Sequence, residues 1–145
     1  MVDESYFDKP CWVIDFLPER VPADGQGRFF EVEANYLLHK NYVNIRKKFS
    51  AVVLKLYCYY EVEVYENYEE NGEINPDPAM LEWTINSNGY DLSILFGNDE
   101  GLMTISIDDT HMTLYASSER LFSLTERIAQ SEGLFMWQPD EEKEG

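Results

Sequence analysis

The sequence has very little positive charge through its middle half. Lys55 is the single basic residue between Phe49 and Glu119, whereas acidic residues recur throughout that stretch. The whole chain has 28 Asp and Glu against 11 Lys and Arg, which gives a formal net charge of -17 at pH 7. A negative field of this size repels phosphate backbones and anionic membrane surfaces. We therefore predict no nucleic-acid partner and no membrane partner, and a basic protein as the partner that this charge favours.

Long apolar runs are also missing. No stretch approaches the ~20 apolar residues needed to cross a bilayer. The first residues, MVDESYFDKP, lack the basic and apolar regions of a secretory signal. We therefore expect a cytoplasmic protein.

Cysteine and histidine are scarce. Cys11 and Cys58 are too few for a disulfide framework, and both lie in apolar, strand-like surroundings where free cysteine acts as a small hydrophobic residue. His39 and His111 show no paired spacing with either cysteine, as a zinc site would need. We predict no zinc site and no cofactor.

A calcium site is not predicted either, although the segment 67–78 imitates a calcium-binding loop. Its acidic and amide residues fall at several ligand positions, with Gly72 at the turn. However, Asn67 stands where the loop needs Asp, and Pro78 stands where it needs a bidentate Glu.

What the chain does have is enough apolar residues to build a core. It has 145 residues, of which 44% are hydrophobic and 14% aromatic, and this argues for one folded domain over residues 1–145. Hydrophobic periodicity predicts strands at 11–18, 58–65, 91–96, 102–107, 111–115 and 134–137, and helices at 28–41, 42–56, 78–83 and 118–132. The order β-α-α-β-(short α)-β-β-β-α-β is typical of a single α+β domain.

In that domain we expect a largely antiparallel sheet of about five or six strands, with two or three helices packed on it. The polar ends, 1–10 and 138–145, are predicted to be frayed tails.

The segment 58–65 alternates between two faces. Cys58, Tyr60, Val62 and Val64 fall on one side, which predicts a half-buried strand. Aromatic and acidic residues share the opposite side and continue into the next loop. We predict that they form a partner-binding face: Tyr59, Glu61, Glu63, Tyr65, Glu66, Tyr68, Glu69 and Glu70. Tyrosine anchors and carboxylates suit the lysines and arginines of a basic protein. The alternative is an acidic surface that serves solubility alone.

Catalysis has weaker support in the sequence. Glu61 and Glu63 are ~6–7 Å apart along one strand face, but a working acid also needs burial in a cleft. Nucleophile and cofactor motifs are absent. We name no catalytic residue. An alternative is a small enzyme or ligand-binding protein with a pocket between helices and sheet, in which Asp15, Glu61 or His111 would be the polar groups. For Asp15 we otherwise expect a pairing with backbone donors or an arginine.

Two segments carry a resemblance. WVIDFLPERVP near the start and SEGLFMWQP near the end resemble a group of short bacterial proteins of similar length with no established activity. In size, acidity and α+β pattern the chain is also similar to immunity proteins that neutralise basic nuclease toxins. We therefore expect a non-enzymatic interaction domain, with a homo-oligomer paired through its sheet as a further alternative.

Overall fold

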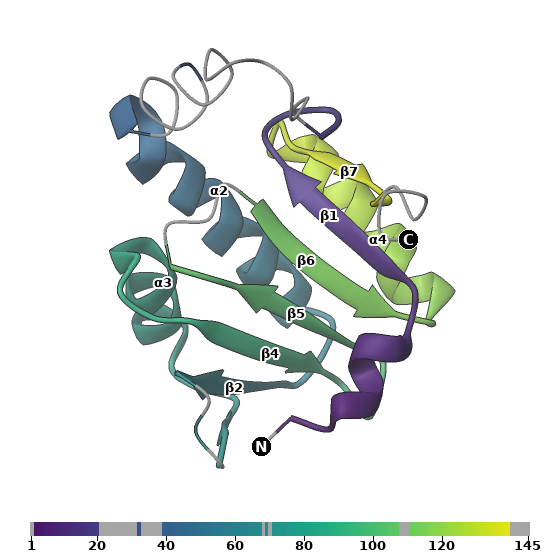
Figure 1. Ribbon diagram of the computed structural model, residues 1–145. Coiled ribbons are helices and arrows are strands. Elements are labelled where there is room, and N and C mark those ends of the chain that lie inside the picture. Colours follow the sequence, from purple (N-terminus) through teal and green to yellow (C-terminus); the bar gives the residue numbers. More distant parts are fainter. Residues whose placement is uncertain are drawn as a thin grey trace.

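A seven-stranded antiparallel sheet with its α-helices on one face forms the protein (Figure 1). The structure is a computed structural model that describes residues 2–20, 32, 39–67, 69, 71–107 and 111–139, without the side chains of 39–43. Within these residues the α+β class is confirmed, although the sheet has more strands than expected. Most of the helix predicted at 28–41 lies outside the described residues.

Eleven elements follow one another along the described chain. They are η1 (Glu4–Asp8), β1 (Cys11–Asp15), α2 (His39–Tyr57), β2 (Val62–Glu66), β3 (Glu73–Ile74), α3 (Pro78–Ser87), β4 (Leu92–Phe96), β5 (Gly101–Ile105), β6 (His111–Ala116), α4 (Glu119–Ser131) and β7 (Phe135–Trp137). The strands lie side by side in the order β3-β2-β4-β5-β6-β1-β7.

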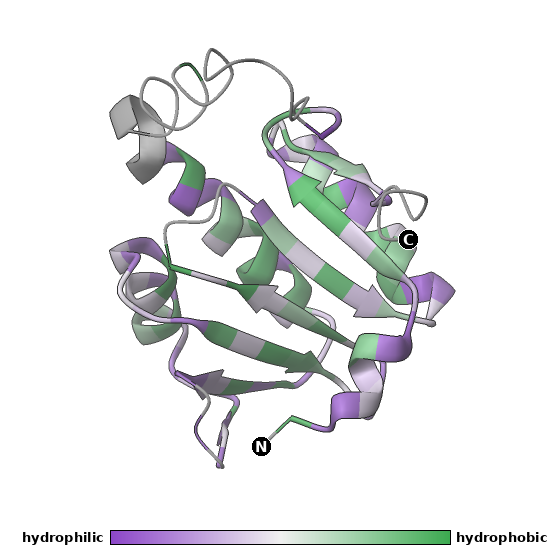
Figure 2. Cartoon of the chain, in the orientation of Figure 1, coloured by the Kyte–Doolittle hydropathy of each residue, from purple (hydrophilic) through white to green (hydrophobic). Residues whose placement is uncertain are grey.

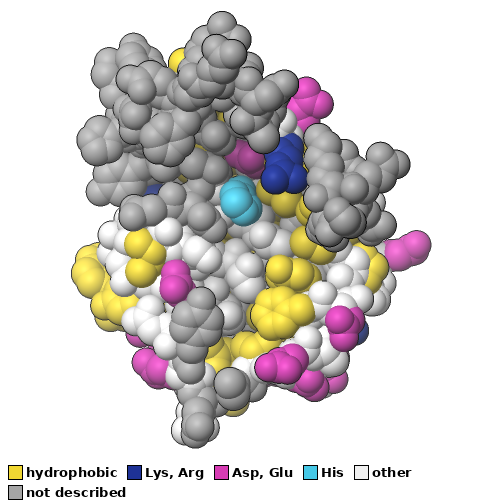
Figure 3. Space-filling view, in the orientation of Figure 1, with side chains coloured by type: hydrophobic (Ala, Val, Ile, Leu, Met, Phe, Trp, Pro, Cys, Tyr) yellow, Lys and Arg dark blue, Asp and Glu magenta, His cyan; other side chains and the backbone are white. Residues whose placement is uncertain are grey.

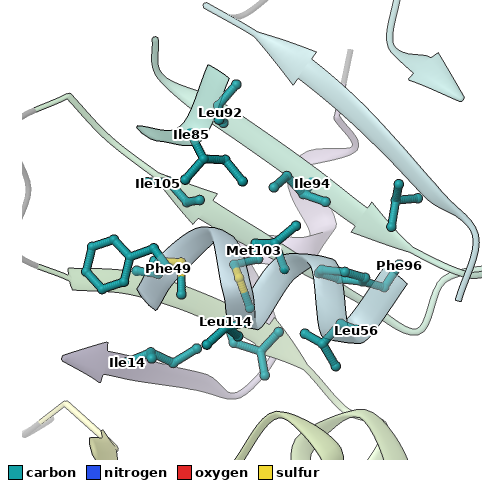
Figure 4. Packing of buried hydrophobic residues seen from close by; sticks show 14 of the residues in the cluster. Ile14, Phe49, Leu56, Ile85, Leu92, Ile94, Phe96, Met103, Ile105 and Leu114 are labelled. Carbon is teal, nitrogen blue, oxygen red and sulfur yellow. The ribbon is translucent and has the colours of Figure 1, made fainter. Parts of the chain in front are cut away.

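The core lies between the sheet and α2, α3 and α4. Phe49, Val52 and Leu56 recur along one stripe of α2 and are completely buried, as a helical period predicts. Met103 and Leu114 face them from the sheet (Figure 4). Each such side chain contributes about 1.5–3 kcal/mol on burial. Hydrophobic and polar residues alternate along the strands (Figure 2). The side chains between the core positions therefore point to the opposite face of the sheet, away from α2, α3 and α4.

That other face, which we call the open face, carries two rows of side chains across the strands. Ser93, Thr104 and Thr113 form a small polar row in direct register. Leu95, Leu102, Tyr115 and Cys11 form an apolar row next to it. Leu102 is completely buried although it points away from the helices. Something must therefore cover this end of the open face.

The cover comes from η1, which replaces part of the frayed tail predicted for residues 1–10. Asp3 caps η1 by accepting a hydrogen bond from the Ser5 backbone. Phe7 packs edge-on against Tyr115 with ring centroids 5.0 Å apart, and Tyr6 is buried. This short segment has no hydrophobic period of its own. Contacts with distant strands hold it in place, so the sequence pattern did not predict it.

The junction between α2 and β2 also differs from the prediction. Period-two alternation was expected from Cys58, but α2 continues to Tyr57 and β2 begins only at Val62. Cys58 is therefore exposed in the connecting turn, contrary to the apolar environment predicted for it. The segment expected to be loop contains β3, which pairs Ile74 with Glu63.

Candidate functional site

The predicted tyrosine and carboxylate face is rearranged by the fold. Tyr59 is 56% exposed, but it lies in the turn before β2. Tyr65 is only 8% exposed, so the prediction that it is an exposed anchor is wrong. Tyr65 is buried because Gly72, which precedes β3, lies directly over its ring. A Cβ atom at Gly72 would be 2.9 Å from Tyr65 Cε1.

The rest of that predicted face is divided. Glu66 is half-buried at the end of β2, and Glu69 is exposed beyond it. The Glu69 backbone N–H donates to the Glu66 carbonyl at 3.0 Å, which forms a turn. Tyr68 and Glu70 lie outside the described residues. The predicted residues thus do not make one continuous strand face.

Glu61 and Glu63 instead join a hollow of about 250 Å³ at the edge of the open face. We call it the acidic hollow, and it is lined by Tyr6, Glu61, Val62, Glu63, Ile74, Leu95, Gly97, Asn98 and Asp99. Its acidic groups come from Glu61 just before β2, from β2 itself and from the turn between β4 and β5, and its apolar surface comes from the neighbouring strands. Acidic side chains lie around the lower edge of the open face in Figure 3.

Each carboxylate of the acidic hollow accepts a hydrogen bond from an uncharged side chain. Tyr6 donates its hydroxyl to Asp99 at 2.6 Å, and Tyr65 donates to Glu63 at 2.9 Å. Asn75 donates its side-chain amide to Glu61 at 3.4 Å. The single ion pair found in the described part of the chain, Lys55 with Glu132, lies elsewhere. The three carboxylates are thus oriented by neutral donors and keep their negative charge available to a ligand.

The two tyrosines are well suited to this role. Burial raises the pKa of the Tyr6 hydroxyl far above its usual value, and the bond and charge of Asp99 raise it further. Burial and the Glu63 carboxylate raise the pKa of Tyr65 in the same direction. Both hydroxyls therefore keep their protons at neutral pH and act as donors. The ammonium of Lys9 is 5.6 Å from the centre of the Tyr6 ring.

Asp15 and His111 are brought together, but not in a pocket between helices and sheet. They are directly opposite each other on β1 and β6, on the open face. Asp15 is buried and its Oδ1 accepts a hydrogen bond from the Leu17 backbone at 3.1 Å, which agrees with the expected pairing to backbone donors. His111 is half-buried. Neither residue lines the acidic hollow.

A second hollow, of about 510 Å³, was not predicted from the sequence. It lies beside η1 and is lined by Phe7, Asp8, Lys9, Pro10, Cys11, Tyr115, Gln138 and Pro139. Cys11 is half-buried there. Sequence reasoning missed this hollow because most of its lining belongs to segments that were predicted to be frayed tails.

Within the described residues, no group of three or more His, Cys, Asp and Glu side chains is arranged to hold a metal ion. No helix among them is both long enough and apolar enough to cross a membrane. No protein family, no curated protein and no solved structure matches the chain. The resemblances to short bacterial proteins and to immunity proteins thus stay predictions.

Proposed function

We propose that the protein is a non-enzymatic interaction domain that binds a basic protein at the acidic hollow, as an immunity or inhibitor protein does. The observation that supports this most directly is the convergence of Glu61, Glu63 and Asp99 on one hollow that also has apolar walls. The chain's net charge of -17 adds long-range attraction for a basic partner.

The chemistry of the hollow fits a lysine or arginine side chain. Such side chains combine an apolar stem with a charged end group. The stem would lie against Leu95 and Ile74, and the end group would meet the three carboxylates through charge-assisted hydrogen bonds. Since Tyr6 and Tyr65 already hold two of these carboxylates, little ordering is needed on binding.

The roles of the predicted binding residues change accordingly. Tyr59, which is exposed two residues before Glu61, remains a candidate aromatic anchor at the rim. Tyr65 becomes a positioning residue that orients Glu63 rather than a contact residue. Catalysis at Glu61 and Glu63 is not favoured, because Glu61 is exposed and a general acid needs a buried site.

The test uses a charge-matched pair of variants. One carries Glu61→Gln, Glu63→Gln and Asp99→Asn in the hollow. The control carries Glu19→Gln, Glu119→Gln and Glu126→Gln, which remove the same charge elsewhere on the chain. The probes are the basic proteins encoded next to its gene, titrated by calorimetry at about 50 mM salt so that screening is weak.

We expect the hollow variant to bind a basic probe at least about tenfold more weakly than the control, the loss that follows from about 1.4 kcal/mol. Equal loss in both variants would show that net charge alone matters and would contradict the proposal. Failure of the unmodified protein to bind any of these basic proteins would contradict it as well.

A further inference from the structure

An exposed apolar surface runs along α3, away from the acidic hollow. Met80 is 59% exposed and Trp83 is 57% exposed, and their spacing of three residues places them on one side of the helix. The Trp83 ring lies 6.5 Å from that of Tyr90, just beyond the end of the helix. Hydrophobic side chains are visible at the left edge of Figure 3, on the side where Figure 1 shows α3.

Ile107 extends this surface. Leu92 and Ile105 pair across β4 and β5, and this register brings Tyr90 and Ile107, each two positions further along its segment, to the same end of the two strands. The Ile107 backbone N–H donates to Asp91 Oδ1 at 2.8 Å, which holds the two segments together. Ile107 is also exposed. We call Met80, Trp83, Tyr90 and Ile107 the α3 strip.

The fold does not use the exposed part of this strip. The buried side of α3 is formed by Leu81, Thr84 and Ile85, which pack against the rest of the core. Met80 and Trp83 point the other way. Tryptophan is a frequent energetic anchor in interfaces, and methionine adapts its shape to different apolar partners. Exposed apolar side chains that gather on one surface are typical of interaction sites.

Two acidic groups lie beside the strip. Asp77 caps the start of α3 and is exposed, and Asp91 directly follows Tyr90 in the sequence. The ion pair of Lys55 with Glu132, the one found in the described part of the chain, joins α2 to the segment after α4 and does not involve these residues. This charge favours a basic occupant. A second copy of a chain with net charge -17 would bring two acidic rims together, which electrostatics opposes.

We propose that the α3 strip binds one basic amphipathic helix of the partner. The apolar side of that helix covers Met80 and Trp83, and its lysines or arginines reach Asp77 and Asp91. α3 has ten residues and is therefore about 15 Å long, so the occupant needs about three helical turns. The inference rests on the proposed function only in taking the partner to be basic, and it assigns a second contact surface.

Trp83 itself reports on the proposal. Trp12 packs against Phe122, and Trp137 is half-buried with its indole N–H donating to the Leu17 carbonyl. Titration of the intact protein with a synthetic leucine–lysine amphipathic helix of about four turns should shift the fluorescence of Trp83 to the blue, because binding removes it from water. The Trp83→Phe variant should lose this shift.

Affinity for the same peptide is then compared in matched variants. Met80→Ser with Trp83→Ser should weaken binding at least about tenfold, as loss of an interface anchor does. Phe135→Ser removes an exposed aromatic residue from β7 and should leave the affinity unchanged. Asp77→Asn removes a charge beside the strip but keeps a residue that can cap α3, and it should weaken binding several-fold even if the double variant fails to fold.

Four outcomes of the peptide and self-association measurements would overturn the proposal. They are equal binding of a scrambled peptide of the same composition, equal binding of a leucine–glutamate helix, unchanged affinity of the strip variants, and self-association of the protein that the double variant abolishes. The hollow variant separates this inference from the proposed function. If the hollow variant no longer binds the basic protein but still binds the peptide, both surfaces act as proposed. If the strip variants bind the basic protein normally, this inference alone is overturned.

Discussion

At the scale of single residues, a few polar side chains hold distant segments together. Tyr6 reaches from η1 to Asp99 in the turn between β4 and β5. Asn67 accepts a hydrogen bond from the Asp91 backbone, and Asn75 does the same for Val62. Asn67 and Asn75 adopt positive φ angles of 50° and 48°, which asparagine tolerates better than most residues. The acidic hollow depends on such links because its parts come from separate segments.

Tyr6→Phe should lower the free energy of unfolding by roughly 1–3 kcal/mol, since it removes a hydrogen bond to a carboxylate. The Tyr6 pKa is raised above its usual value of 10.0 in the folded protein. Its contribution is therefore present in full below about pH 10 and is lost as the pH rises further. Urea unfolding between pH 7 and strongly alkaline pH should show the difference between the two proteins shrinking at the alkaline end.

Tyr59→Phe is the control for this prediction, because Tyr59 is exposed and should change stability by less than about 0.5 kcal/mol. A difference between Tyr6→Phe and the unmodified protein that stays constant across the alkaline range would contradict the proposed role of the hydroxyl.

Gly72→Ala should destabilise the protein by about 1–3 kcal/mol through overpacking. The new Cβ would lie 2.7 Å from Glu63 Cγ and 2.9 Å from Tyr65 Cε1, so both side chains would have to move. Gly89→Ala is a matched control with no close neighbour except Ser87 Oγ at 3.6 Å. Thermal unfolding of both variants tests this, and equal midpoints would show that the loop yields without strain.

At the scale of elements, helix ends and strand edges are controlled by specific side chains. Ser118 caps α4 by accepting a hydrogen bond from the Leu121 backbone at 3.2 Å, and its hydroxyl donates to Glu100 at 3.0 Å. α3 ends at Asn88, which adopts the left-handed conformation. The two edge strands, β3 and β7, are short, and short edges resist pairing with other chains.

Ser118→Ala should cost about 1 kcal/mol, the usual effect of removing a helix N-cap. Ser117→Ala is the control, because Ser117 is exposed next to the cap and does not occupy the capping position. Chemical denaturation of both variants measures the difference. If the two substitutions had the same effect, the cap would not contribute as the geometry indicates.

At the scale of the whole molecule, unbalanced negative charge is the dominant property. The 28 acidic and 11 basic residues leave most carboxylates without a cation. Like charges repel one another within the folded chain and lower its stability. The same repulsion opposes self-association.

Added salt should therefore raise the stability of the protein. Raising sodium chloride from about 10 mM to about 0.5 M shortens the screening length and weakens the repulsion. The thermal midpoint should rise, and it should rise less in the hollow variant, which carries three fewer negative charges. A midpoint that falls with salt would mean that attractive pairs outweigh the repulsion.

Local patterns in the sequence were enough to determine the α+β class and most of the core. The spacing of Phe49, Val52 and Leu56 predicts the buried stripe of α2, because a helix repeats every 3.6 residues. The alternation of Leu92, Ile94 and Phe96 predicts their burial on one side of β4 in the same way. Both patterns depend only on neighbours along the chain.

Tertiary structure alone decided the arrangement of the candidate site. Tyr65 follows the alternation of its strand, but the loop that returns over it with Gly72 makes it buried. Tyr6 belongs to a segment with no periodic signal, yet it meets Asp99, 93 positions away in the sequence. No local pattern records which distant segments will lie against each other, because that depends on how the whole sheet is ordered and packed.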